Sequence, residues 1–299
     1  MALGDSGLRT KELTERVRGY TPRTVYRYTS KLTEIGITER HEEAGVPSKV
    51  THSLTNPCGR ELHDLVEAYA TASLSRLPNG EIDAHAWGSL TLLADLWEAR
   101  MIEVLHRGPQ SPTELSRGPH GLSYHQVSRR ASLFAIGGFI EERQDNGRRR
   151  RYALTERARR AMALVAGVGR WRQRHLVAEG EMAMTPGEAA SALRTALPLV
   201  ALPEQTGKGL QIKVGTEKIR VRIEDHGGLR EGEPLVPNVD GEARGKVEAW
   251  LDALVTGSTS GIRTEGDSAL TETLLSHLYR ALWASGEPER QLAQSVPVA

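Results

Sequence analysis

The stretch TELSRGPHGLSYHQVSRRASLFAIGGFIE at residues 113–141 repeats the stretch KELTERVRGYTPRTVYRYTSKLTEIGITE at residues 11–39. With an offset of 102 residues, eight aligned positions are identical, where roughly two are expected from average residue usage. The next segment is two residues shorter in the second copy. After it the match resumes at an offset of 100, where Leu54-Thr55 align with Leu154-Thr155. The first half of the chain therefore contains an internal duplication, and each copy is about as long as one small domain.

Each copy has the pattern of two short helices joined by a turn. In the first copy, Thr10 is expected to cap a short helix, and Thr21-Pro22 starts a second helix that ends near Gly36. In the second copy Ser123 takes the capping position and Gly137-Gly138 ends the helix. The inward faces of the two second helices are predicted to be Val25, Thr29 and Leu32, and Val127, Ala131 and Phe134.

A β-hairpin and a closing helix follow each helix pair. In the second copy, strands at 139–143 and 148–154 flank a turn at 144–147 that contains Asn-Gly, a strong hairpin signal. The corresponding hairpin of the first copy spans 37–54, and Thr55 and Thr155 begin the closing helices. A helix-turn-helix followed by a two-stranded wing is a winged helix.

The runs TPRTVYRYTSKLTEIGITER, VTHSLTNPCGRELHDLVEAYA, LWEARMIEVLHRGPQSPTELSRGPHGLSYHQVSRRASLFAIGGFIEER and RRRRYALTERARRAM resemble the winged helix-turn-helix transcriptional regulators of the HxlR and MarR-like kind. The resemblance covers about 170 residues and lies in the whole pattern. It implies a protein that binds double-stranded DNA, although winged helices also serve as protein-interaction modules. Such regulators usually dimerise on a palindrome, so the resemblance implies that one chain with two copies forms a pseudo-dimer. A homodimer remains an alternative.

The first copy departs from this family pattern at its start. The second copy is preceded by an amphipathic segment at 85–106, and the matching helix of the first copy would fall before Met1. Either the first domain lacks that helix and is covered in another way, or the natural start lies upstream.

The second helix of a winged helix lies in the major groove of DNA, and the wing follows the backbone or enters the minor groove. Arginine suits guanine, glutamine suits adenine, and Ser, Thr or Tyr can hold phosphates. Because strand residues alternate between two faces, at most about half of the wing arginines can follow one phosphate row, and the rest are expected to pair with acids such as Glu141 and Glu142. The alternative is that any exposed helix face is polar. The predicted DNA contacts are Arg23, Thr24, Tyr26, Arg27 and Ser30 in the first copy, His125, Gln126, Ser128, Arg129 and Ser132 in the second, and Arg148, Arg149, Arg150 and Arg151 in its wing.

The net charge of +1 hides an uneven distribution along the chain. Residues 123–160 hold ten arginines and four acids, whereas residues 231–299 hold eleven acids and five bases. The second copy should therefore dominate the affinity for DNA. Because the two recognition faces differ, we expect two different half-sites with centres roughly 34 Å apart.

A third domain follows a polar linker at 178–188. Alternating apolar residues at 210–214 and 219–223 predict a hairpin with one buried face, and two helices follow at about 247–254 and 268–283. The stretch GEARGKVEAWLDALVTGSTSGIRTEGDSALTETLLSHLYRALW resembles domains of the sterol-carrier-protein type. That resemblance implies a tunnel for an apolar small molecule, with Trp250 as one wall. The alternative is that these residues only fill a core.

The expected fold class is α+β, with two tandem winged helix-turn-helix domains at 1–78 and 79–177, a smaller α+β domain of sterol-carrier type at 189–285, and a polar tail at 286–299. No stretch approaches the ~20 apolar residues that span a bilayer, and the N-terminus lacks the features of a signal peptide. The single cysteine, Cys58, cannot form an intrachain disulfide. We therefore expect a cytoplasmic protein with no membrane partner.

The chain lacks the enzyme motifs GxxxxGK[ST], HExxH, CxxC and GxSxG. No catalytic activity, cofactor or metal is expected, and Cys58 fits a structural role. The first hypothesis is a transcriptional regulator in which an apolar effector or a partner acts on the C-terminal domain. The second is a small-molecule-binding or sequestering resistance protein, in which the winged helices are structural or line the ligand pocket. A DNA-acting enzyme is the third.

Overall fold

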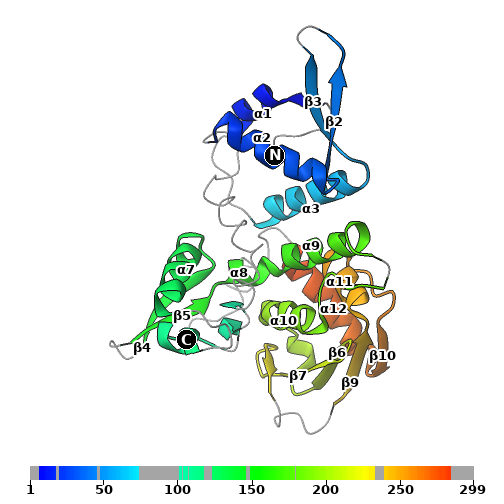
Figure 1. Cartoon of the computed structure of the whole chain (residues 1–299). Helices are drawn as coiled ribbons and strands as arrows, with labels where there is room; N and C mark the ends of the chain where they lie inside the picture. Colours follow the sequence, from blue (N-terminus) through cyan, green and yellow to red (C-terminus); the bar gives the residue numbers. More distant parts are fainter. Residues whose placement is uncertain are drawn as a thin grey trace. The chain divides into compact units, whose positions relative to one another are not determined.

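A computed structural model of the chain describes residues 7–17, 20–45, 48–73, 101–102, 104–106, 108–117, 123–145, 149–178, 180–232 and 239–283 (Figure 1). Helices and strands are both abundant, so the predicted α+β class is confirmed. The chain forms two compact units: one consists of residues 1–68 with 171–183, and the other of residues 69–170 with 184–299. The domain limits expected from the sequence stay predictions, and the expected polar tail lies outside the described residues.

The first unit begins with a short strand that pairs with a later hairpin. Its elements are β1 (Leu8–Arg9), α1 (Thr10–Arg16), α2 (Pro22–Glu34), β2 (Thr38–Glu43), β3 (Lys49–Leu54) and α3 (Cys58–Ser73), and the strand order is β1-β3-β2. The prediction that Thr10 caps α1 is wrong, because Thr10 is already helical and Arg9 precedes the helix. Arg9 pairs with Thr51 of β3, which keeps the backbone extended up to Thr10.

The second copy of the duplication has the same order of elements. These are α6 (Pro112–Arg117), α7 (Tyr124–Ile136), β4 (Ile140–Asp145), β5 (Arg149–Leu154), α8 (Glu156–Arg160) and α9 (Met162–His175). Thr38 faces Leu54 in the first hairpin, and Ile140 faces Leu154 in the second. These pairs differ by the offsets of 102 and 100 that the sequence predicts, so the duplication is confirmed at the level of strand register.

Hydrogen bonds outside the hairpins repeat in the same way. The hydroxyl of Thr55 donates to the carbonyl of Gly36 at 2.6 Å, and that of Thr155 donates to Gly138 at 2.7 Å. Both carbonyls belong to glycines with positive φ, 76° and 70°, that follow α2 and α7. The threonine that precedes each closing helix therefore also fixes the end of the preceding helix.

The two copies differ in how completely the core side of the second helix is covered. Val127, Ala131 and Phe134 of α7 are 1%, 0% and 0% exposed. In α2, the counterparts of the first two, Val25 and Thr29, are 7% and 5% exposed, and Leu32, the counterpart of Phe134, is only half-buried. The predicted inward faces are correct, but the first copy is the more open of the two.

His52 is a buried histidine of β3. Its side chain is 3% exposed, and neither ring nitrogen has a partner in the described part of the chain. Burial lowers the pKa of His52, and the charge of Arg40 lowers it further. The folded chain therefore holds the ring neutral at a pH where the unfolded chain protonates it.

We expect the free energy of unfolding to fall as the pH drops through the ordinary histidine pKa of about 6.5, because the unfolded chain then binds the extra proton. His52→Leu removes this titration, so the fall in stability between about pH 7.5 and about pH 5.5 should be smaller in the variant. Thermal unfolding at the two pH values measures the difference. An equal fall in the two proteins would contradict the assignment.

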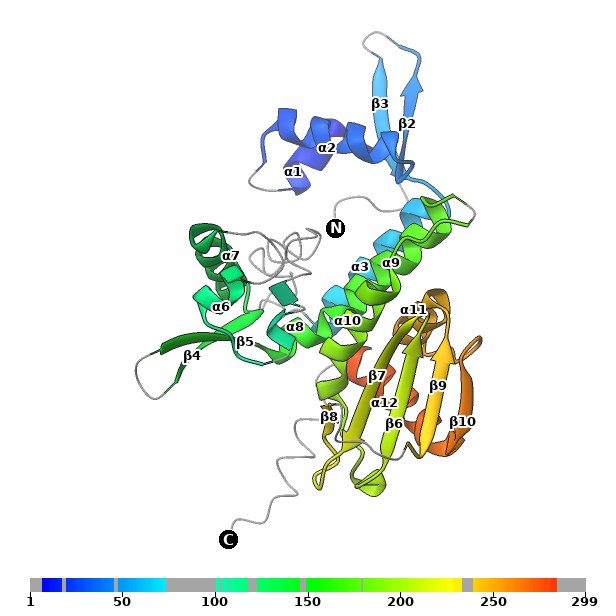
Figure 2. The same cartoon turned by 60° about the horizontal axis from the view of Figure 1, so that its bottom comes forward.

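The C-terminal part of the second unit is a five-stranded sheet with helices against it. Its elements are α10 (Pro186–Ala196), the short 3₁₀ helices η1 (Leu197–Leu199) and η2 (Pro203–Gln205), β6 (Gly209–Val214), β7 (Glu217–Ile223), β8 (Leu229–Glu231), β9 (Gly241–Gly245), α11 (Val247–Thr256), β10 (Arg263–Gly266) and α12 (Ser268–Trp283). The strand order is β10-β9-β6-β7-β8, and β6 and β9 are parallel. Helices α10, α11 and α12 pack against the sheet, and Figure 2 shows α12 behind it.

The predicted hairpin and the two predicted helices of this part are confirmed. In β7, Ile219, Val221 and Ile223 are buried whereas Lys218 and Arg222 are exposed, so one face of the sheet is buried. The predicted linker at 178–188 is too long, because the hydroxyl of Thr185 accepts a hydrogen bond from the amide of Glu188 at 3.2 Å and caps α10.

No helix in the described ranges is long and apolar enough to cross a membrane.

Candidate nucleic-acid interface

Helix α2 presents the predicted contact residues of the first copy on its outer side. Arg23, Tyr26 and Arg27 are exposed, and Thr24 and Ser30 are half-buried. The hydroxyl of Thr24 lies 2.9 Å from that of Thr21, so it belongs to the cap of the helix. The exposed part of this face therefore consists mainly of two arginines and an aromatic ring.

Tyr28, which was not predicted as a contact, lies at the edge of this face, because it also lines an apolar pocket of the first unit. Its ring is 51% exposed, and the guanidinium carbon of Arg27 lies 5.3 Å from the ring centroid. An aromatic ring that is half in solvent holds the arginine by a cation–π contact. The only sequence feature that could have indicated this contact is a tyrosine among polar positions.

Helix α7 presents the corresponding residues of the second copy. His125, Gln126, Arg129 and Ser132 are exposed, whereas Ser128 is half-buried. The side-chain oxygen of Gln126 accepts a hydrogen bond from the amide of Ser123 at 2.9 Å, and the amide of Gln126 donates to the hydroxyl of Ser123 at 3.4 Å. Gln126 thus completes a capping box, and its carbonyl oxygen is already engaged.

The remaining side chains of α7 differ in whether they have hydrogen-bond or ion-pair partners among the described residues. The hydroxyl of Ser132 donates to the carbonyl of Ser128 at 3.0 Å, a bond within the helix. Arg129 makes no hydrogen bond or ion pair with any other residue that the structure describes. It is therefore the cationic side chain of α7 best placed to meet an external partner.

The wing arginines of the second copy make contacts within their own domain. Arg150 forms an ion pair of 2.7 Å with Glu142, as the alternation of strand residues predicted. Arg151 donates to the carbonyl of Pro109 at 2.9 Å and lies 3.7 Å from Glu114. Arg148 lies outside the described residues, and the side chain of Arg149 also lies outside them although its backbone belongs to β5.

The wing of the first copy has a different charge. Strand β2 carries Glu39, Glu42 and Glu43, all exposed, and Arg40 pairs with Glu42 at 3.0 Å. These carboxylates would repel phosphates. The aligned positions of β4 are Glu141, Gln144 and Asp145, but β5 adds three arginines at 149–151, where β3 of the first wing has Lys49, Val50 and Thr51. The side chains therefore favour the second copy as the main contributor to DNA affinity.

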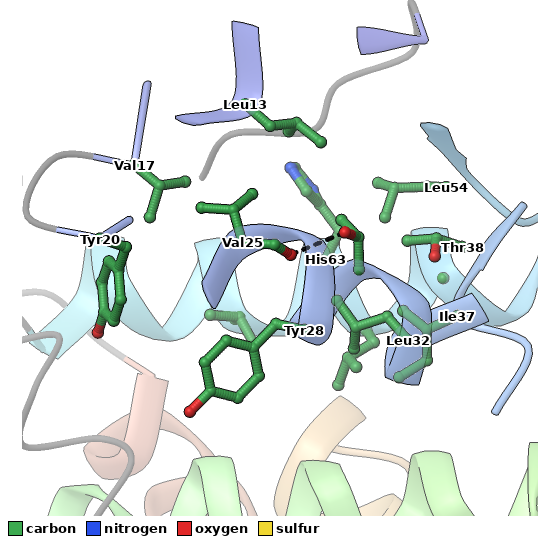
Figure 3. Close-up of a pocket in the computed structure, with 14 residues that line it drawn as sticks. Leu13, Val17, Tyr20, Val25, Tyr28, Leu32, Ile37, Thr38, Leu54 and His63 are labelled. Atoms are coloured by element: carbon green, nitrogen blue, oxygen red, sulfur yellow. Dashed lines mark hydrogen bonds between the residues drawn. The ribbon is translucent and has the colours of Figure 1, made fainter. Parts of the chain in front are cut away.

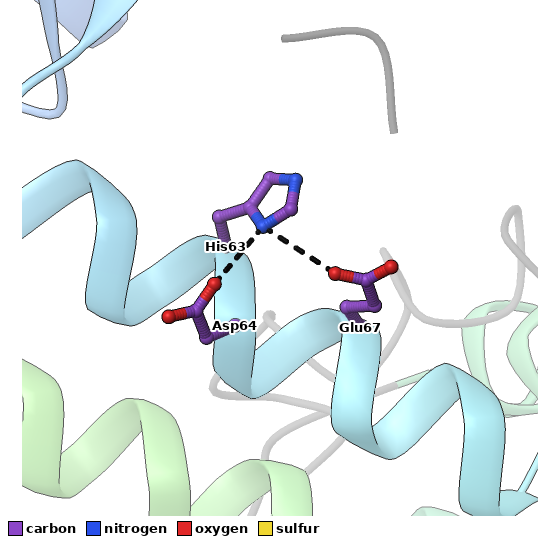
Figure 4. Close-up of side chains that lie close together, drawn as sticks. All are labelled: His63, Asp64 and Glu67. Carbon is purple, nitrogen blue, oxygen red and sulfur yellow. Dashed lines mark hydrogen bonds and ion pairs between the residues drawn. The ribbon is translucent and has the colours of Figure 1, made fainter. Parts of the chain in front are cut away.

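Three side chains of α3 approach the spacing of a metal site. His63 Nδ1 lies 3.3 Å from a carboxylate oxygen of Asp64 and 3.7 Å from one of Glu67 (Figure 4). All three come from one helix, and both carboxylates are more than 60% exposed. This is the geometry of a surface ion-pair group, and we assign no metal to it.

The first residue of the same helix, Cys58, is half-buried, and burial raises the pKa of its thiol. A raised pKa reduces the thiolate fraction, which disfavours a nucleophilic role.

Trp250 of α11 is fully buried, and its indole nitrogen donates to the carbonyl of Lys213 at 2.8 Å. The hydrogen bond satisfies the polar atom of the ring, as a core position requires. A ligand tunnel beside Trp250 stays a prediction.

In comparisons with known proteins, no protein-family model matches the chain, and a search of curated proteins gave no match.

Proposed function

We propose that the chain is a DNA-binding transcriptional regulator in which two tandem winged helices contact double-stranded DNA. The observation that carries the proposal is that the same exposed arginine occurs at equivalent positions, Arg27 of α2 and Arg129 of α7, in two copies that share their strand register. An arginine on the outer face of the second helix is suited to guanine in the major groove.

In this proposal α7 contributes more than α2. Arg129 would contact a guanine, and exposed His125, near the start of the helix, would lie close to a base edge or a phosphate. Gln126 is less suited to contact an adenine than its sequence position implied, because its oxygen caps the helix. Arg150 would exchange its exposed ion pair with Glu142 for a phosphate, a small energetic change because surface ion pairs contribute at most about 1 kcal/mol.

Fluorescence anisotropy with the purified chain tests the proposal. The labelled duplexes are the chain's own upstream intergenic DNA and a scrambled duplex of the same composition, each at two salt concentrations. We expect tighter binding to the intergenic duplex, and an affinity that falls with salt because phosphate contacts release counterions. Equal affinity for the two duplexes at both salt concentrations would contradict the proposal.

A further inference from the structure

The first unit contains an apolar cavity of about 420 Å³ beneath α2 (Figure 3). Its walls come from α1, α2, β2, β3, α3 and the segments that join them. The apolar side chains used below are Leu13, Val25, Leu32, Leu54, Leu62 and Val66. The volume falls within the range of about 300–1,000 Å³ that is typical of small-ligand sites.

The polar side chains in the walls are mostly satisfied within the protein. The hydroxyl of Thr29 donates to the carbonyl of Val25 at 2.7 Å, and that of Thr38 lies 2.9 Å from the hydroxyl of Thr33. His63 also lines the cavity, while its Nδ1 atom faces Asp64 and Glu67 on the same helix. Tyr20 and Tyr28 also line the space, and each is more than half exposed, so it opens to solvent on that side. The other walls are mainly apolar, which suits an apolar molecule.

The duplication provides a comparison for this space. Phe134 is fully buried in the second copy, whereas its counterpart in the first copy, Leu32, is half-buried and lines the cavity. A smaller side chain and a more exposed core face thus coincide with the cavity in one copy of the duplication. Apolar walls that face an open pocket are in contact with water, and a ligand that covers them would remove this apolar surface from water.

We infer that this cavity binds a largely apolar small molecule with two or three rings. Helix α2 contributes Val25 and Leu32 to the cavity and carries Arg23, Tyr26 and Arg27 on its outer side. A ligand that moves α2 changes the position of that outer side, and one that stiffens α2 limits the positions it can adopt. In both cases occupancy of the cavity changes DNA affinity. The binding site stands on its own, whereas the effect on DNA rests on the proposed function.

The probe for the test is N-phenyl-1-naphthylamine, a neutral three-ring molecule whose fluorescence rises in apolar surroundings. It is titrated into the unmodified full chain without DNA, and methyl NMR spectra of leucine and valine locate it. We expect shifts of methyl signals from the six apolar wall residues, and none for Leu176, which is exposed and outside the cavity. No binding, or shifts confined to other methyl groups, overturns the site.

Two matched variants test the site: one fills the cavity, and the other is a control outside it. Leu62→Trp adds an indole to the wall and should weaken probe binding by at least about tenfold. Leu176→Trp makes the same change at an exposed position of the same unit and should leave the affinity unchanged. Far-UV circular dichroism checks folding, and Val66→Phe replaces Leu62→Trp if that variant does not fold. Equal probe affinities in the filled and control variants contradict the site.

The anisotropy titration with intergenic DNA is then repeated at saturating probe. We expect the dissociation constant for DNA to change by at least about fivefold. If the probe binds in the cavity and DNA affinity does not change, the coupling through α2 is overturned. If the probe binds there and the chain shows no specific DNA binding, the ligand site stands and the proposed regulator fails.

Discussion

Arg129→Ala is expected to weaken binding to the specific duplex by about 1–3 kcal/mol, roughly 5–150-fold, because it removes a bidentate contact with guanine. Arg129 is exposed and has no partner among the described residues, so its replacement disturbs little of the fold. Fluorescence anisotropy measures the loss. Arg129→Lys should weaken specific binding as well, since an ammonium cannot form the two parallel hydrogen bonds of a guanidinium.

A matched control for Arg129→Ala is Arg263→Ala, which removes the same charge from an exposed position of β10. We expect it to change specific binding by less than twofold. The affinity of Arg129→Ala for the scrambled duplex should fall much less than its affinity for the specific duplex. Equal losses on the two duplexes would indicate a phosphate contact and contradict base recognition by Arg129.

Phe134→Ala is expected to destabilise the second unit by about 3–5 kcal/mol, because it removes a fully buried ring from the core beneath α7. The ring also meets Phe139 edge-on, with centroids 5.9 Å apart, and this contact would be lost. Urea unfolding followed by circular dichroism measures the change.

The counterpart variant in the first copy is Leu32→Ala. Leu32 is half-buried beside the cavity, so its truncation removes fewer contacts and should cost less than half as much. Equal losses in free energy for the two variants would show that the first core is as closely packed as the second.

Features set by neighbouring residues could be predicted from the sequence. Thr21 and Ser123 accept hydrogen bonds from the amides three residues later, and α12 spans Ser268–Trp283 as its apolar spacing predicted. A cap or an amphipathic helix depends on contacts within a few residues, which the sequence displays directly. The sequence also displays the capping box of Ser123 and Gln126, which gives the glutamine a structural role at a position predicted to contact DNA.

Features set by distant residues could not be predicted. Strand β1 pairs with β3 across more than 40 residues, and the parallel pair of β6 and β9 places Leu210 beside Gly241. Strand β8 lies between the predicted hairpin and the predicted helices, where no element is predicted from the sequence, and its pairing with β7 decides its conformation. The cavity beneath α2 could not be predicted for a related reason. The size of an unfilled space depends on how closely side chains from distant parts of the sequence pack together.

The first unit is built from two separate parts of the chain. The indole of Trp171 donates to the carbonyl of Cys58 at 2.8 Å, and His175 lies 3.0 Å from Glu61. Residues 171–183 thus complete a unit whose other residues end at 68.

During synthesis on the ribosome, 115 further residues, 183 minus 68, must therefore be added after residue 68 before all parts of the first unit exist. At about 5–20 residues per second this delay is on the order of ten seconds, long compared with the folding of most small domains. The N-terminal residues are made first, but their unit is not complete until a large part of the other unit has been made.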